Sequence, residues 1–445
     1  MEVEFMRIIF CGEALFSSRN LAKRLDPGLV NMLREADAVY VNAEFCTPKP
    51  ETPPGIGMFL TSIRPEALDE FVDLNIKLVQ FANNHTGDYG WQGVMDTIEA
   101  AEARGLIPCG VGRNLEDARK ARFYDTPSGR IGVVASASTW SERFVASMPC
   151  ADLPARPGLC PLRWGQAYVL PNEEFEQLRK IDEKLGTRQS MLDVSRVETW
   201  ELPDDEHFKF GSAMQGNLLI ERGERAYVRT YVNDEDEQAI LKSIRDAAKR
   251  SDAVVATLHT HEGINENWYS SEPPTFIEEF ARKSIDAGAN AVVAHGAHCA
   301  RGVEIYKGRP IFYSLGSLLM EFEAGESMIS PEMYHNYNLP ADARPSDLHG
   351  GRAKNTKGEW TGFYAERRFS KHFMVVMDVN DGKVEYKIVP LFLDMQDDNP
   401  LKRGLPQIAS IEVGSDIVND LEELSRKYST RFVYNYEDGT IAIRE

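Results

Sequence analysis

The sequence has no C-x-x-C pair, and its six cysteines are scattered along the chain. It therefore lacks the cysteine-rich ligand set on which structural zinc sites generally depend. Nothing in the spacing demands disulfides, so we expect free thiols and a reducing, cytoplasmic environment. Cys11 and Cys299 flank polar motifs described below. We interpret both as thiols that pack as small hydrophobes rather than as metal ligands.

Long apolar runs are also absent. No run approaches the length of about 18 residues that a membrane-spanning helix needs. The segment Met1 to Arg7 carries charge and leads straight into the first predicted strand, without the pattern of a signal peptide. We therefore expect no membrane span, no export signal and no membrane partner.

Positive charge is scarce in this chain. Its 50 Lys and Arg stand against 69 Asp and Glu, which gives a formal net charge of -19. This balance disfavours a general nucleic-acid binder or a binder of anionic membranes. An anionic small-molecule or peptide-like substrate remains compatible with it, because one metal centre can reverse the local field.

Apolar strands alternate with helical patterns along most of the 445 residues, which predicts an α/β protein. The first predicted helix runs from about Asn20 to Arg34. Proline-containing, mixed polar sequence at 139–235 interrupts the alternation and indicates an insertion. Residues 321–368 are rich in Gly, Pro, Asn and charge, and we expect a long irregular segment there. The predicted domains are therefore 1–320 with its insertion, and 321–445 as an extension that completes the fold.

Polar groups follow five of the predicted strands. Because the carboxyl ends of strands are where ligands collect in α/β sheets, these groups are candidates for one site. Taken alone, each histidine is better explained as a surface or cap residue, but five of the nine histidines fall in these windows. Imidazoles, carboxylates and a carboxamide suit zinc, manganese or iron, as one or two ions. The windows contain Glu13; Asn42 and Glu44; Asn83, Asn84, His85 and Asp88; His259, His261 and Glu262; and His295 and His298.

The same residues resemble the CapA family of poly-γ-glutamate capsule proteins, whose domain is related to calcineurin-like metallophosphoesterases. The resemblance covers roughly residues 6–320 and implies a four-layer αββα sandwich with metals at one end of its sheets. The matching pieces are Gly12-Glu13, Asn42-Ala43-Glu44, Ala82-Asn83-Asn84-His85, Asp88-Tyr89-Gly90, Leu258-His259-Thr260-His261-Glu262-Gly263, Ala294-His295-Gly296-Ala297-His298 and Gly308 to Ser317.

Two features depart from the pattern that the resemblance implies. Relatives usually carry Gly-Asp where this chain has Gly12-Glu13, and the longer side chain moves its carboxylate. The last metal-binding motif of phosphoesterases is typically Gly-His-x-His, whereas His295 and His298 lie three residues apart. Ordinary two-metal phosphoester chemistry is therefore not the first expectation.

The resemblance and the residue types together imply a metal-dependent hydrolase, with an amide such as a γ-glutamyl bond favoured over a phosphoester. By analogy with the phosphoesterases, His85 is the expected proton donor or oxyanion stabiliser, and Asp88 is expected to orient it. Arg19, Arg163 and Arg301 are candidates for pairing an anionic substrate, although each alone is better explained as a structural arginine. The expected metal ligands are Glu13, Glu44, Asn84, His259, His261, His295 and His298.

Three alternatives stay open at this point. One is a phosphoesterase, one is a non-catalytic accessory protein of poly-γ-glutamate assembly, and the weakest is a structural metal protein. The segment 321–368 either closes over the site or builds a homo-oligomer contact. Four tryptophans are candidates for a substrate wall, with core packing as the plainer explanation for each: Trp140, Trp164, Trp268 and Trp360.

Overall fold

The computed structural model describes residues 5–55, 60–201, 204–322 and 329–444. Its largest element is a ten-stranded sheet. Its strands are β1 (Met6–Leu15), β2 (Ala38–Ala43), β3 (Ile76–Gln80), β4 (Ile107–Cys109), β17 (Ser317–Met320), β18 (Lys371–Asn380), β19 (Lys383–Phe392), β20 (Gln407–Ile408), β21 (Arg431–Tyr434) and β22 (Ile441–Arg444). Their order is β21-β22-β19-β18-β1-β2-β3-β4, with β17 beside β1 and β20 beside β19.

A six-stranded sheet packs against the first. Its order is β15-β16-β14-β13-β7-β6. Its strands are β6 (Arg122–Thr126), β7 (Gly129–Ala137), β13 (Ala253–Thr260), β14 (Ala291–Gly296), β15 (Val303–Tyr306) and β16 (Arg309–Phe312). The inner faces of the two sheets share one core, in which Ile8 and Tyr40 lie with Val133 and Val255.

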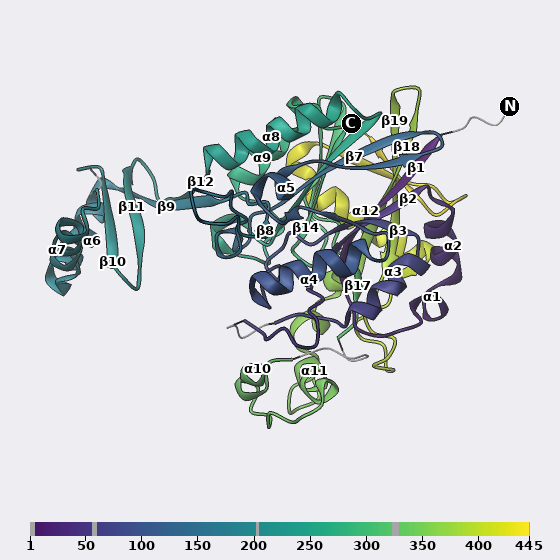
Figure 1. Cartoon of the computed structure of the whole chain (residues 1–445), viewed down its shortest axis with the longest axis horizontal. Coiled ribbons are helices and arrows are strands. Elements are labelled where there is room, and N and C mark those ends of the chain that lie inside the picture. Colours follow the sequence, from purple (N-terminus) through teal and green to yellow (C-terminus); the bar gives the residue numbers. More distant parts are fainter. Residues whose placement is uncertain (1–4, 56–59, 202–203, 323–328, 445) are drawn as a thin grey trace.

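Helices cover both outer faces, which confirms the predicted four-layer sandwich (Figure 1). On the large sheet lie α2 (Pro27–Glu35), α3 (Asp69–Asp73) and α4 (Gly90–Glu102), and on the smaller sheet lie α8 (Asp234–Ala248) and α9 (Thr275–Asp286). In β1, Ile9 and Cys11 pack towards the helices while Ile8 and Phe10 pack towards the other sheet. Strands buried on both faces explain the continuous apolar runs in the sequence.

The strands that carry the polar windows run parallel to their neighbours. β1 pairs with β2, β2 with β3, and β13 with both β7 and β14, all in parallel. Their carboxyl ends therefore lie at the same edge of each sheet, and the polar groups that follow them meet there.

The predicted first helix is two helices. α1 (Leu21–Arg24) ends before Pro27, which begins α2, and Asp26 accepts a hydrogen bond from the backbone N–H of Leu29 as its N-cap. Proline has no N–H to continue a helix but suits a first turn, so one expected helix of residues 20–34 is divided here.

Residues 164–232 form a projecting unit between β7 and α8 (Figure 1). Phe175, Phe208 and Ile220 make its small core. It contains β9 (Trp164–Pro171), α6 (Asn172–Leu185), α7 (Thr187–Glu198), β10 (His207–Ser212), β11 (Gly216–Gly223) and β12 (Tyr227–Val232). Four of these elements are strands that form their own sheet, in the order β10-β11-β9-β12.

The segment expected to be irregular at 321–368 contains two helices, although its residues 323–328 lie outside the described part of the chain. α10 (Pro331–Asn336) and α11 (Pro345–Ala353) each begin at a proline and pack on a core of Met333, Tyr334 and Leu348. Such short helices carry too little apolar periodicity to be recognised from sequence. We call Phe322 together with residues 329–369 the cap.

The tail completes the large sheet. β18 to β22 extend it beyond β1, and α12 (Ile411–Leu424) contributes Ile417 and Leu421 to the core between the sheets. Across the described ranges, no helix is both long and apolar enough to cross a bilayer.

Candidate metal centre

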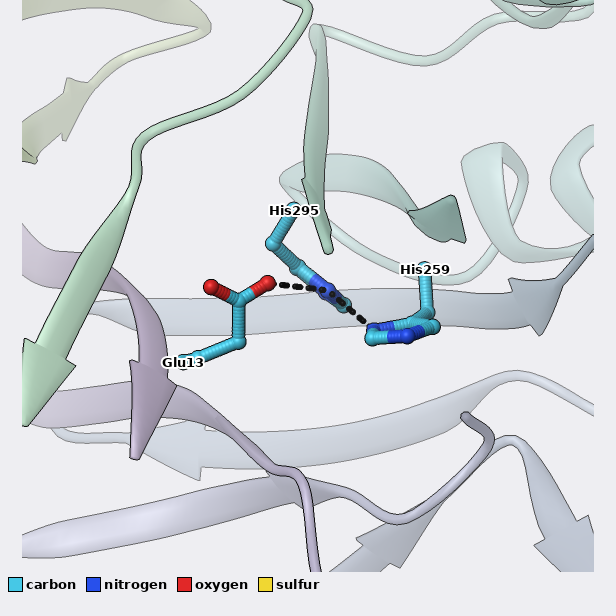
Figure 2. Close-up of side chains that lie close together, drawn as sticks. All are labelled: Glu13, His259 and His295. Carbon is cyan, nitrogen blue, oxygen red and sulfur yellow. Dashed lines mark hydrogen bonds and ion pairs between the residues drawn. The ribbon is translucent and has the colours of Figure 1, made fainter. Parts of the chain in front are cut away.

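The structure brings together all nine residues that were predicted as ligands or catalytic groups. Glu13 lies on β1, His259 on β13 and His295 on β14, and their side chains point towards one another (Figure 2). The other six follow strand ends. All nine are buried: Glu13, Glu44, Asn84, His85, Asp88, His259, His261, His295 and His298.

The ligand atoms form three overlapping groups, within each of which all the atoms lie within 4.8 Å of one another. Every group contains Glu13 or Glu44, and His259 belongs to two of them, so the groups make one continuous centre. The groups are Glu13, His259 and His295; Glu44, His259 and His261; and Glu13, Glu44 and His298.

Unpaired buried atoms show that this centre fits a cation. Glu13 Oε1 and Glu44 Oε2 are buried and accept no hydrogen bond, while His298 Nδ1 lies 3.3 Å from the other oxygen of Glu13. Glu44 Oε1 lies 3.2 Å from His261 Nε2, and Glu44 Oε2 lies 3.6 Å from His298 Nε2. Burying unpaired carboxylate oxygens is costly unless a positive group faces them. The donor set of carboxylates and imidazoles suits a divalent metal such as zinc, manganese or iron.

Glu44, His259 and His295 have charges that agree with a ligand role, whereas His298 differs. Burial would lower the pKa of His298, but Glu44 and Glu13 raise it to about 9, so this imidazole must lose a proton before it can bind an ion. Burial alone would raise the pKa of Glu44, but His298, His261 and His259 outweigh it and hold that pKa below its usual range. Burial lowers the pKa of His295 to about 4 and that of His259 well below its ordinary value. Both imidazoles are therefore neutral at neutral pH, which is the form that binds metals.

His85 and Asp88 form a pair beside the centre. His85 Nδ1 lies 2.7 Å from Asp88 Oδ2, and the same oxygen accepts a hydrogen bond of 2.6 Å from the Thr61 backbone N–H. Burial would lower the pKa of His85, but Asp88 and Glu44 raise it above its ordinary value. The pair thus favours the protonated form of this imidazole at the edge of the site.

The two asparagines before His85 differ in what they contact. Asn83 donates to the Ala43 carbonyl oxygen at 2.7 Å and accepts from the His85 backbone N–H at 3.0 Å, so it fixes the loop. Asn84 Oδ1 instead lies 2.7 Å from His259 Nε2, within the centre.

Sequence reasoning missed the support behind His295. Tyr40 Oη lies 3.0 Å from His295 Nε2 and donates to Gln80 Oε1, which also accepts from Thr257. Gln80 and Thr257 stand inside otherwise apolar strands. Because buried polar groups need partners, these two residues were the sequence signal for a hydrogen-bonded network there.

The three arginines predicted to bind substrate are engaged elsewhere. Arg19 pairs with Glu70 at 3.0 Å, and Arg163 pairs with Asp236 at 2.6 Å. Arg301 is fully buried and donates to the backbone carbonyls of residues 261, 262, 268 and 270. Its contacts hold the loop that carries His261 in place.

A cavity of about 280 Å³ lies over the centre. Glu44, His85 and His261 are among the polar residues that line it, and Arg352 of α11 in the cap also lines it. Described residues of the cap thus form one wall of the site. Arg352 was not a predicted site residue, because the sequence placed α11 in an irregular segment.

The four tryptophans have different surroundings. Trp140 and Trp268 line the cavity, with ring centroids 5.3 Å apart. Trp164 stacks on Phe276 at 5.0 Å, and Trp360 stacks on Tyr364 at 6.1 Å. Two of the four are therefore walls of the site.

Comparison with known proteins identifies the family. The model of "Bacterial capsule synthesis protein PGA_cap" matches residues 8–321. An uncharacterised protein of Sinorhizobium fredii is 28% identical over 99% of this chain and 94% of its own length. The PGA biosynthesis protein CapA of Bacillus subtilis is 22% identical over 73% of this chain and 64% of its own length.

Two further matches are more distant or differently named. A Mycobacterium tuberculosis protein named "Probable polyglutamine synthesis accessory protein" is 23% identical over 78% of this chain and 73% of its own length. Among solved structures, a novel phosphatase of Mycoplasma pneumoniae is 12% identical and covers 88% of this chain and 94% of that chain. Its TM-score is 0.36. The family match over residues 8–321 confirms the resemblance found in the sequence: the chain belongs to the PGA_cap family of bacterial capsule synthesis proteins.

Proposed function

We propose that this protein is a metal-dependent hydrolase that cleaves an amide bond of the γ-glutamyl or a related peptide-like type. The observation that carries the proposal is that two buried carboxylate oxygens, Glu13 Oε1 and Glu44 Oε2, accept no hydrogen bond and lie among four imidazoles. One or two ions of zinc, manganese or iron would be held by Glu13, Glu44, Asn84, His259, His261, His295 and His298.

A bound divalent ion would lower the pKa of water and polarise the scissile carbonyl. In the overall reaction, the water oxygen bonds to the acyl carbon and the C–N bond breaks. The leaving nitrogen must gain a proton to depart as an amine. His85 lines the cavity and its pKa is raised, so it is placed to donate that proton, while Asp88 holds its Nδ1 side.

The amide is favoured over a phosphoester by the charges that face the cavity. Phosphoryl groups are generally clamped by several cations. Among the described residues that line this cavity, the arginines and lysines amount to Arg352 alone.

A second candidate is a non-catalytic accessory role in polymer assembly, which the name of the Mycobacterium tuberculosis relative favours. A metal-reconstituted activity screen across phosphoesters, γ-glutamyl amides and cyclic amides separates the candidates. We expect turnover of an amide by the wild type and turnover lower by about 10²–10⁴-fold by His85→Ala. Turnover of phosphoesters alone would replace the amide proposal. Metal binding without turnover of any of the three classes would favour the accessory role.

A further inference from the structure

The motif from Gly308 to Ser317 ends beside the metal centre. Ser317 begins β17, which lies next to β1, and it stands opposite Glu13 in the parallel register of the two strands. Its hydroxyl donates a hydrogen bond of 3.1 Å to Glu13 Oε2. Both side chains are buried, so bulk water does not reach this contact.

This hydrogen bond distinguishes the two oxygens of Glu13. Oε2 accepts from Ser317 and also lies 3.3 Å from His298 Nδ1. Oε1 accepts no hydrogen bond and lies 4.0 Å from His295 Nδ1. That nitrogen lies 3.3 Å from His259 Nδ1, so Oε1 faces the imidazole pair (Figure 2). Because a carboxylate turns as one rigid group, a donor on Oε2 also fixes the direction of Oε1.

Two close backbone approaches hold Ser317 at this distance. The Glu13 backbone N–H donates to the Gly316 carbonyl oxygen at 3.2 Å. A Cβ on Gly12 would lie 1.8 Å from that oxygen, and a Cβ on Gly316, which has a φ of +75°, would lie 2.1 Å from His372 Nδ1. Only glycine fits both positions. The two glycines thus let the strands meet closely enough for the Ser317 hydroxyl to reach Glu13.

His372 of β18 holds the backbone of Ser317. Its Nδ1 accepts a hydrogen bond of 3.0 Å from the Ser317 N–H, and its Nε2 lies 2.8 Å from the Phe369 carbonyl oxygen. A carbonyl only accepts and a backbone N–H only donates, so this imidazole is neutral and carries its proton on Nε2. Burial lowers the pKa of His372 to about 4, which agrees with the neutral form. His372 is therefore a fixed acceptor for Ser317.

We propose that Ser317 is a positioning residue of the metal centre, and that His372 holds Ser317 in place for this role. The Ser317 hydroxyl keeps the Glu13 carboxylate turned so that Oε1 faces His295 and His259 before an ion arrives. Less side-chain freedom is then lost when the ion binds. The inference rests on the proposed function for the presence of an ion, and on the hydrogen bonds for the role of Ser317.

The test is the affinity of the full-length protein for Zn²⁺, measured after removal of bound metal by competition with a chromophoric chelator. Ser317→Ala should weaken Zn²⁺ binding by about 10–100-fold, which is the usual cost of losing a hydrogen-bond partner of a metal ligand. Ser317→Thr keeps a hydroxyl on the same carbon and should restore most of the affinity. Wild-type affinity in Ser317→Ala, or equal losses in Ser317→Ala and Ser317→Thr, would overturn the proposal.

Ser284→Ala on α9 is the matched control. Ser284 is also buried, and its hydroxyl donates to the Phe280 carbonyl oxygen at 2.8 Å, so the variant loses a buried hydrogen bond outside the centre. It should bind Zn²⁺ as the wild type does. Circular dichroism of each metal-free variant checks that the chain is folded. A loss in Ser284→Ala as large as that in Ser317→Ala would show a general effect of stability and overturn the assignment.

The role of His372 is tested in the same assay. His372→Leu removes the acceptor of the Ser317 N–H and should weaken Zn²⁺ binding by a smaller factor than Ser317→Ala does. His372→Asn offers a side-chain oxygen in place of Nδ1 and should restore part of the loss. Wild-type affinity in His372→Leu would overturn the role assigned to His372.

This proposal and the proposed function fail in different ways. If the wild type cleaves an amide and Ser317→Ala binds Zn²⁺ as tightly as the wild type, the positioning role is wrong while the hydrolase stands. If Ser317→Ala loses affinity as expected but the wild type cleaves no amide, the hydrolase is wrong while the positioning role stands.

Discussion

The candidate metal centre and the cap line one cavity, but they are built in different ways. Sheet registers fix the centre: His259 pairs with His295 across β13 and β14, and Glu13 pairs with Asn42 across β1 and β2. The cap depends on two short helices and a small core around Leu348. Geometry in the centre is therefore tied to the whole sandwich, whereas the cap can change without it.

This difference predicts that the centre and the cap have separate roles. Changes among the strand-end residues should remove metal and turnover together, because those side chains make the centre. Changes in the cap should alter substrate affinity and leave the metal in place, because Arg352 and Phe363 reach the cavity from outside the sheets.

The largest effect is expected for Glu44→Gln. The substitution keeps the shape of the side chain but removes the negative charge that faces His261 and His298. At least one equivalent of metal should be lost, and turnover should fall on the order of a thousandfold. Metal analysis and kinetics check this.

Glu304→Gln is the matched control, because Glu304 is also a buried glutamate but pairs with Arg282 and Tyr313 away from the site. Full metal content in Glu44→Gln would show that Glu44 is not a ligand.

His85→Ala should lower turnover by about 10²–10⁴-fold without loss of metal, because His85 is expected to move a proton rather than to bind the ion. Asp88→Asn should lower it by about 10–100-fold, since Asp88 acts through the orientation of His85. Metal content and turnover are measured on the same samples. Parallel loss of metal in His85→Ala would make His85 a ligand instead.

Leu348→Ala tests the cap. Leu348 is fully buried against Met333 and Tyr334, so its truncation should weaken this small core by about 2–5 kcal/mol. We expect KM to rise by about tenfold, with metal content unchanged, because the wall of the cavity loosens while the centre stays intact.

The exposed Leu401→Ala serves as the control for Leu348→Ala. Loss of metal from Leu348→Ala would mean that the cap and the centre are not separable.

The smallest effect is expected in the pH dependence of the stability of the cap. The pKa of His349 is about 4 in the folded cap and about 6.5 in an unfolded chain. The unfolded state therefore binds more protons between these values. The stability that the buried, neutral His349 gives to the cap is present above about pH 6.5. It is lost as the pH falls towards 4, by at most about 3 kcal/mol. Hydrogen exchange of α11 amides, with α4 as reference, should show this loss in the wild type and less of it in His349→Phe.

Much of the fold and the position of the centre could be predicted from sequence. Continuous apolar strands such as β13 end in polar groups, and parallel pairing then brings those groups together whatever the details of the loops. The prediction of a single helix from Asn20 to Arg34 was wrong, because Pro27 begins a second helix there.

The cap could not be predicted in the same way. α11 has little apolar periodicity, and its place over the cavity depends on packing between segments far apart in the chain. Arg352 was therefore missed as a cavity residue. Arg301 was proposed for substrate because it follows His298 in sequence, but its side chain is used to hold a loop.

The most direct test of the central claim is the metal content of the full-length protein, purified without chelator and measured by elemental analysis. We predict one or two equivalents of zinc, manganese or iron per chain, removed by a chelator together with turnover and restored with it. A stable, folded chain that holds no stoichiometric transition metal, both as purified and after reloading, would contradict the account.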